Sequence, residues 1–128
     1  MIRNMTQTSL LDFPLLTLPA YQRQAILLKV AVLLRQEQAT LAELISQEVQ
    51  KPITLAHREV ERAISLFEEA AAEAVRFGGA WLPADVQAST VHHQIFSKQV
   101  PLGPLLAITP FNYPINLAVH KIAPAMAV

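Results

Sequence analysis

A short apolar run, Leu105–Ile108, lies between Pro104 and Pro110 and constrains the fold more than any other stretch of the chain. A continuous apolar run of this length between two breakers is typical of a β-strand that is buried on both faces in a parallel sheet. Such a strand needs paired neighbours at both edges, because its backbone groups must be hydrogen-bonded. Few other strands are predicted here. We therefore expect strand 105–109 to belong to a larger sheet, and the sequence to be cut inside a fold.

Three amphipathic helices are predicted before this run, after an irregular lead-in. The lead-in covers residues 1–19, and the helices cover about 20–37, 40–50 and 54–77. Each helical segment carries apolar residues at three- and four-residue spacing, with charged residues between them. Thr40 is expected to cap the second helix, with Glu43 completing a capping box. Gly78–Gly79 is expected to end the third, because glycine takes the left-handed conformation without steric cost.

The helical period is lost after Gly79. Residues 86–99 are rich in β-branched and aromatic side chains, and we expect them to be extended. Residues 115–127 are predicted to form a helix, with Pro114 in its first turn and Pro124 as an internal irregularity. The expected fold class is α/β: amino-terminal helices followed by the opening strand–turn–helix unit of a parallel sheet, truncated.

The composition excludes several function classes. Apolar residues make up 52% of the chain, so disorder is not expected. Ten basic and ten acidic residues cancel, which leaves no basic surface for nucleic acid. The absence of cysteine removes disulfides, thiolate metal sites and any thiol nucleophile. No signal peptide or apolar span is recognisable. We expect a soluble cytoplasmic protein without a nucleic-acid or membrane partner.

Two motifs in the last third of the chain carry a family resemblance. The run Ile-Thr-Pro-Phe-Asn-Tyr-Pro at 108–114, followed by His-Lys-Ile-Ala-Pro-Ala at 120–125, resembles the first strand–turn–helix of the aldehyde dehydrogenase superfamily. The resemblance covers about Tyr21 to Val128. Upstream it includes Arg23, Ile26-Leu27, Glu48, Lys51-Pro52 and Glu59-Val60. It implies a dinucleotide-binding sheet and an enzyme that oxidises an aldehyde to a carboxylic acid with NAD or NADP.

The resemblance also implies a role for each matching position. Asn112 matches the asparagine whose side-chain amide donates a hydrogen bond to the oxyanion of the thiohemiacetal intermediate. The wall of the cofactor cleft, at the carboxyl end of the strand, is matched by Ile108, Thr109, Pro110 and Phe111. The helix face that borders the aldehyde tunnel is matched by Tyr113, Leu117 and His120. The implied partner is a small aldehyde, and the bare strand edges predict a homo-oligomer or self-association.

The sequence also departs from the family pattern. Gln50 stands where the family usually has glycine, which puts the local turn in doubt. The strands that normally precede the first helix are either missing or replaced by residues 1–19. The chain ends one step before the family's glycine-asparagine pair and cofactor-binding lysine, and its catalytic cysteine and general-base glutamate lie farther on. We therefore expect the 128-residue chain to be inactive by itself.

Simpler interpretations remain open for the same residues. Spacing alone makes Asn112 a helix N-cap, a role that is compatible with oxyanion binding. His120 is either a substrate contact or an ordinary interior or surface histidine. His92 and His93 alternate between the faces of an extended segment, so they are expected to be solvent-exposed, and no metal site is predicted. For the whole chain, the alternatives are a small helical interaction module at 20–78 or a truncated reading frame without independent function.

Overall fold

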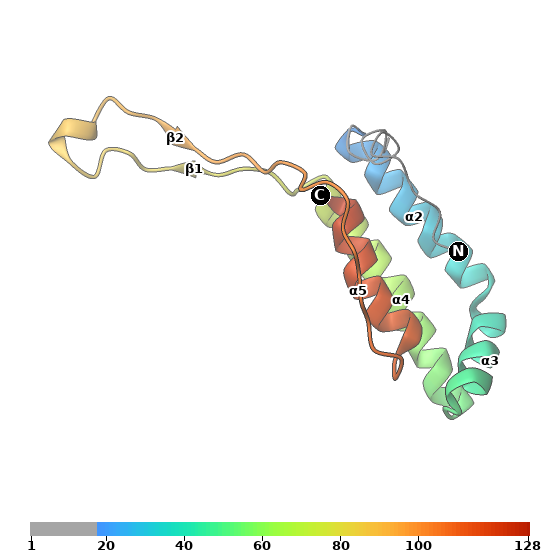
Figure 1. Ribbon diagram of the computed structural model, residues 1–128. Helices are drawn as coiled ribbons and strands as arrows, with labels where there is room; N and C mark the ends of the chain where they lie inside the picture. The colour runs from blue at the N-terminus through green and yellow to red at the C-terminus, as the bar shows by residue number, and fades with distance from the viewer. Residues whose placement is uncertain (1–17) are drawn as a thin grey trace, which may run out of the picture.

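The computed structural model describes residues 18–128, which form a helical bundle with a long two-stranded arm (Figure 1). The bundle consists of α2 (Ala20–Gln36), α3 (Gln38–Val49), α4 (Ile53–Ala74) and α5 (Pro114–Ala127). The arm contains β1 (Trp81–Leu82), the 3₁₀ turn η2 (Ala88–Thr90) and β2 (Ile95–Phe96). The helix predictions are confirmed to within a few residues, but a parallel sheet is absent from residues 18–128.

Helix α4 is the centre of the bundle. Its buried side chains recur every three or four residues, so they form one continuous stripe along the helix. The stripe comprises Ala56, Glu59, Val60, Ala63, Ile64, Phe67, Ala70, Ala71 and Ala74. The small alanines allow α2 and α5 to pack closely against α4. Leu27 of α2, Ile45 of α3 and Val119 of α5 belong to the same core.

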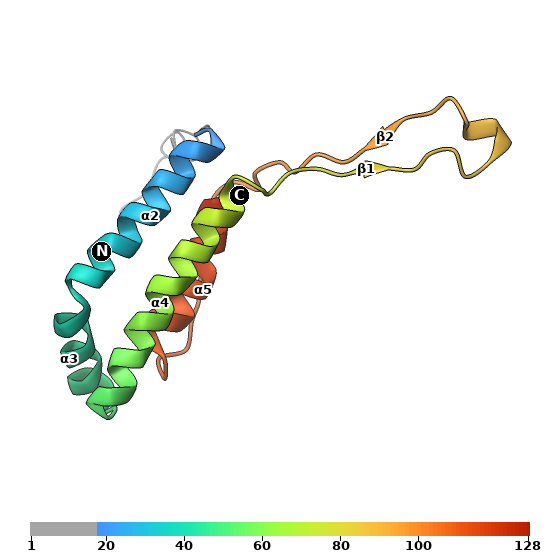
Figure 2. The same cartoon turned by 180° about the vertical axis from the view of Figure 1, so that it is seen from behind.

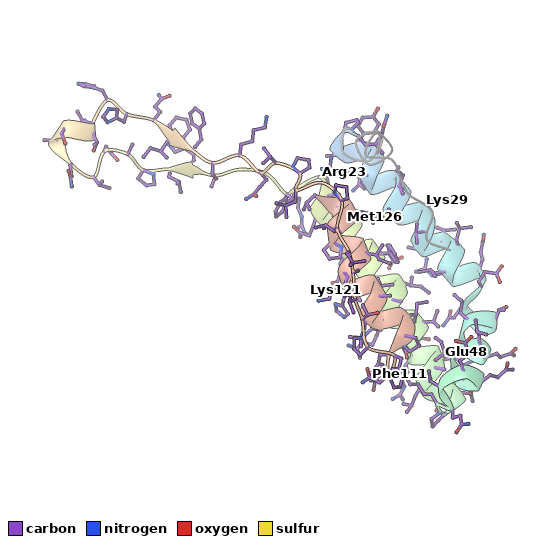
Figure 3. The ribbon with its side chains drawn as sticks, viewed as in Figure 1. Arg23, Lys29, Glu48, Phe111, Lys121 and Met126 are labelled. Atoms are coloured by element: carbon purple, nitrogen blue, oxygen red, sulfur yellow. The ribbon has the colours of Figure 1, made fainter. Side chains whose placement is uncertain are left out.

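The direction of the helices decides which of their ends meet. Helix α2 runs opposite to α4, whereas α4 and α5 run in the same direction (Figures 1 and 2). The start of α2 therefore meets the end of α5, where Arg23 Nε donates a hydrogen bond to the carbonyl of Ala127 at 3.1 Å. Figure 3 shows Arg23 and Met126 at this end of the bundle. At the opposite end, the starts of α4 and α5 come together.

The predicted capping box at Thr40 is wrong. Helix α3 begins at Gln38 after Glu37, and no side chain caps it. The reason is that the chain scarcely leaves the helical path between α2 and α3. The amide of Glu37 is bonded to the carbonyl of Leu33 at 3.1 Å, and the carbonyl of Glu37 accepts from Leu41 at 2.9 Å. Thr40 thus lies inside the helix, where no backbone amide is left for it to cap.

The predicted glycine stop of the third helix is also wrong. Helix α4 ends at Ala74, and Val75 is its C-cap in a right-handed conformation. The amides of Arg76 and Phe77 both bond to the carbonyl of Glu73, which closes the last turn. Neither Gly78 nor Gly79 has a positive φ. The two glycines instead begin the extended path into the arm.

The extended prediction for 86–99 holds only in its second half. β1 pairs with β2 in antiparallel register, Trp81 opposite Phe96 and Leu82 opposite Ile95. Residues 81–96 therefore form a hairpin, and the segment 86–99 supplies its η2 turn and its second strand rather than one continuous strand. The arm projects away from the helices and does not contribute to the core (Figure 1).

Residues 105–109 are not a strand in this structure. They form part of an irregular segment that returns from the arm along α5 to its start (Figure 1). Leu105, Leu106 and Ile108 are exposed, and the segment flanks a shallow groove with Ile122 and Met126 of α5. The physical reason is that a parallel strand requires neighbours, and residues 18–128 supply none next to it.

Candidate functional site

The residues at the centre of the recognised motif lie in an exposed bend, residues 111–113, directly before α5. Helix α5 begins at Pro114, as predicted, because proline has no backbone N–H to satisfy in the first turn. Phe111 is 82% exposed, and Figure 3 shows it at the same end of the bundle as Glu48 of α3. Asn112 is also exposed, and its side chain makes no hydrogen bond within residues 18–128.

Glu59 of α4 caps the start of α5 from a neighbouring helix. The residue is only 2% exposed, and its Oε1 accepts the backbone N–H of Ile115 at 3.1 Å and of Asn116 at 3.3 Å. These amides have no partner inside their own helix, and they form the positive end of its dipole. A carboxylate at this place therefore receives two hydrogen bonds and a favourable electrostatic field.

The N-cap hypothesis for Asn112 is wrong as a consequence. The N-cap position is occupied by Tyr113, which makes no side-chain cap hydrogen bond. The amides that an N-cap side chain would accept are already bonded to Glu59. Asn112 is thus left without a capping role.

Lys51 connects Glu59 to the bend. Its Nζ donates to Glu59 Oε2 at 2.5 Å and to the backbone carbonyl of Asn112 at 2.8 Å. The same ammonium lies 3.8 Å from the centre of the Tyr113 ring, a cation–π contact. The side chain of Lys51 is 11% exposed, so its charge is largely removed from water and balanced by the carboxylate.

Lys51 follows a residue in the left-handed backbone conformation. Gln50 ends α3 with φ 52° and ψ 39°, the conformation for which glycine is favoured. The turn that was in doubt from the sequence is therefore formed, although glutamine occupies it. Ser46 Oγ donates to the carbonyl of Lys51 at 2.7 Å and ties the turn back to α3.

The other predicted site residues fall into two groups. Ile108 and Pro110 are exposed and Thr109 is half-buried on the segment that leads into the bend. Leu117 lies one turn after Tyr113 and donates its N–H to the Tyr113 carbonyl at 3.0 Å. His120 lines a separate hollow between α4 and α5, which Glu73 and Phe77 also line. Ile108, Thr109, Pro110 and Leu117 therefore lie next to the bend, whereas His120 lines a different hollow.

Sequence reasoning missed Lys51 and Glu59 as site residues and treated them only as marks of the resemblance. One signal was available, because Glu59 occupies a position in the apolar stripe of α4, between Ala56 and Ala63. A carboxylate in such a stripe requires a partner. The identity of the partner was hidden, because it depends on a contact 56 positions away along the chain.

The remaining polar groups in the described part of the chain do not form a metal site. His92 and His93 are exposed, and residues 18–128 contain no group of three acidic or histidine side chains that could hold a metal ion. The side-chain oxygen of Asn116 is buried and has no hydrogen-bond partner among these residues. None of their helices is long and apolar enough to cross a membrane.

Comparison with known sequences identifies relatives over most of the chain. The sequence model of the aldehyde dehydrogenase family matches residues 9–128. The 3-sulfolactaldehyde dehydrogenase of Priestia aryabhattai is 40% identical over 111 residues, which cover 87% of this chain and 23% of the relative. The lactaldehyde dehydrogenase of Methanocaldococcus jannaschii is 38% identical over 110 residues, which cover 86% of this chain and 22% of the relative.

Solved structures contain the same arrangement of elements. Aldehyde dehydrogenase 21 from Physcomitrella patens, in complex with the reaction product succinate, superposes with a TM-score of 0.84 at 39% identity. That match covers 90% of this chain and 24% of the other. The glyceraldehyde-3-phosphate dehydrogenase GapN of Methanocaldococcus jannaschii, complexed with NADP, gives 0.80 at 37% identity over 88% of this chain and 24% of its own. The chain thus spans about a quarter of the length of the proteins it matches.

Proposed function

The chain belongs to the aldehyde dehydrogenase family, and we propose that it forms the amino-terminal part of an NAD(P)-dependent enzyme that oxidises an aldehyde to a carboxylic acid. The observation that carries the proposal is the state of Asn112. The ammonium of Lys51 donates to the backbone carbonyl of Asn112 at 2.8 Å, while the exposed side chain of Asn112 makes no hydrogen bond within residues 18–128. A neutral amide at a fixed place is well suited to donate to an oxyanion.

The role of Asn112 follows from the charges in the reaction. A thiolate attacks the aldehyde carbonyl, and negative charge develops on the carbonyl oxygen. None of the 128 residues is cysteine, so the thiolate must come from elsewhere in the complete enzyme. The Asn112 amide stabilises the oxygen without a charge of its own, and so does not quench the thiolate. Aspartate would repel the oxyanion, and alanine would leave it without this donor.

The cofactor is proposed to lie against the segment before the bend. Ile108 and Phe111 are each 82% exposed, which provides an apolar surface that suits the flat rings of a dinucleotide. Helix N-termini often bind phosphate groups, but the amides at the start of α5 are already bonded to Glu59. The cofactor phosphates are therefore not expected there. The proposed cleft residues are Ile108, Thr109, Pro110 and Phe111. NAD or NADP, when bound, accepts the hydride from the substrate.

The remaining parts of the site follow from the family. We propose that Tyr113, Leu117 and His120 border the path of a small aldehyde, and that residues 105–109 become the first strand of a parallel sheet when further strands lie beside them. The exposure of Leu105, Leu106 and Ile108 supports the formation of this strand, because an exposed apolar segment gains free energy when it is buried against other strands. A homo-oligomer is proposed on the same basis.

A chimera tests the proposal. The segment of Methanocaldococcus jannaschii lactaldehyde dehydrogenase that aligns with this chain is replaced by the chain itself, and oxidation of lactaldehyde is followed with NAD and with NADP. We expect activity in the chimera, and a kcat lowered about 10²–10³-fold by Asn112→Ala, with a much smaller change in KM. Gln47→Ala, which removes an exposed amide of α3, should leave kcat unchanged. A folded but inactive chimera, or full kcat in Asn112→Ala, would contradict the proposal.

A further inference from the structure

We propose that Lys51 and Glu59 are positioning residues that hold the Asn112 bend on the start of α5, so that the Asn112 amide is presented in one orientation. The inference rests on the proposed role of Asn112 and adds the pair of side chains that supports it. Neither residue is proposed to touch the substrate or the cofactor.

The first link joins Glu59 to α5. One carboxylate oxygen accepts the amides of Ile115 and Asn116, and the other accepts from Lys51. Both oxygens are therefore bonded in a place where water has almost no access. Because Glu59 lies on the central helix of the core, this link fixes the first turn of α5 relative to α4.

The second link joins Lys51 to the bend. Its ammonium bonds to the carbonyl of Asn112 and lies over the ring of Tyr113, the following residue. The Asn112 side chain branches from the same Cα as that carbonyl, so holding the carbonyl and the neighbouring ring limits the directions the amide can take. A donor that is already oriented does not need to reorganise when charge develops on the substrate.

Stability alone does not account for a charged pair at this place. A buried ion pair can often be replaced by apolar side chains without loss of stability, because removing both charges from water is costly. The Arg35–Glu68 pair provides the comparison. Its side chains are 54% and 43% exposed, it joins α2 to α4, and neither residue bonds to the bend. It is therefore a matched control with the same charges and no path to Asn112.

The test measures kcat in the chimera described above. Lys51→Met and Glu59→Gln should each lower kcat about tenfold with little change in KM, and Lys51→Arg should retain most of the activity. In an Asn112→Ala background the two substitutions should cause no further loss, because the group that they position is already absent. Arg35→Met and Glu68→Gln should be neutral in both backgrounds.

A second measurement covers the case in which Glu59→Gln fails to fold. In the 128-residue chain, the amides of Ile115 and Asn116 should exchange with solvent about tenfold faster in Lys51→Met than in the parent or in Arg35→Met. Unchanged exchange would overturn the positioning inference, as would equal losses of kcat with and without Asn112. Full kcat in Asn112→Ala would instead overturn the proposed function, and the exchange rates would still decide whether the pair holds the bend.

Discussion

Glu59 and Asn116 are 57 positions apart, yet the carboxylate of the first accepts the backbone N–H of the second at 3.3 Å. The contact joins the central helix of the bundle to the helix that follows the Asn112 bend. It explains why α4 and α5 run in the same direction although a long arm separates them along the chain, since the starts of both helices must meet at one place.

The loss of this contact should be costly to the fold. Glu59→Ala leaves the ammonium of Lys51 and the amides of Ile115 and Asn116 without their acceptor in a buried place. We expect the free energy of unfolding of the 128-residue chain to fall by about 3 kcal/mol, as measured by urea denaturation followed by circular dichroism. Glu68→Ala, which removes an exposed partner of Arg35, should cost less than about 1 kcal/mol. Equal losses in the two variants would contradict the role of Glu59.

The left-handed turn at Gln50 should be improved by glycine. A side chain with Cβ is strained at φ 52°, whereas glycine is not. We expect Gln50→Gly to raise the free energy of unfolding by about 0.5–1 kcal/mol, less than the full strain because glycine is also freer in the unfolded chain. The control is Gln47→Gly, inside α3, which should lower it by about 1 kcal/mol. Thermal melts of the parent, Gln50→Gly and Gln47→Gly show whether each substitution raises or lowers stability. A destabilised Gln50→Gly would contradict the strain argument.

The exposed apolar segment before the bend should cause self-association. Leu102, Leu106, Ile108 and Phe111 are among the most exposed large apolar side chains of residues 18–128. We expect the 128-residue chain to elute as oligomers in size-exclusion chromatography with light scattering, and Leu106→Glu to shift it toward monomer. Leu28→Glu, on the outer side of α2, should shift it much less. A compact monomer of the parent chain would contradict this expectation and favour an independent helical interaction module.

The parts of the fold that could be predicted from the sequence are those that depend on neighbours along the chain. Periodicity located α2 to α5 to within a few residues, because an amphipathic stripe is a local pattern. The ends of the helices were predicted less well, because Thr40 and Gly78 match capping patterns that the backbone does not use. The strand predicted at 105–109 is not formed within residues 18–128, because the pairing of a strand depends on neighbouring strands that these residues do not supply.

The site divides in the same way. The start of α5 at Pro114 was predicted, because the preference of proline for the first helical turn is a local feature. Lys51 and Glu59 were not, because their importance comes from contacts with residues 61 and 56 positions away. The family resemblance implies a role for Asn112, which remains a prediction, and the structure adds the hydrogen bond from Lys51 to its backbone carbonyl. The proposed roles of the other site residues also remain predictions: Ile108, Thr109, Pro110, Phe111, Tyr113, Leu117 and His120.

The base of the arm depends on the absence of one Cβ atom. A Cβ added to Gly79 would lie 1.7 Å from the carbonyl oxygen of Ser97, whereas a Cβ on Gly78 would meet nothing within 4 Å. The next pair along the arm, Ser97 N–H to the Ala80 carbonyl at 2.9 Å, requires the two chains to stay close. Gly79→Ala should therefore separate them and break the pairing of β1 with β2, which is short and only marginally stable.

Nuclear Overhauser effects between Trp81 and Phe96, whose ring centroids are 5.9 Å apart, should be lost in Gly79→Ala and kept in Gly78→Ala. The free energy of unfolding should change by less than about 1 kcal/mol in both variants, because the arm lies outside the core. Persistence of these effects in Gly79→Ala would show that the arm can shift to accept the methyl group.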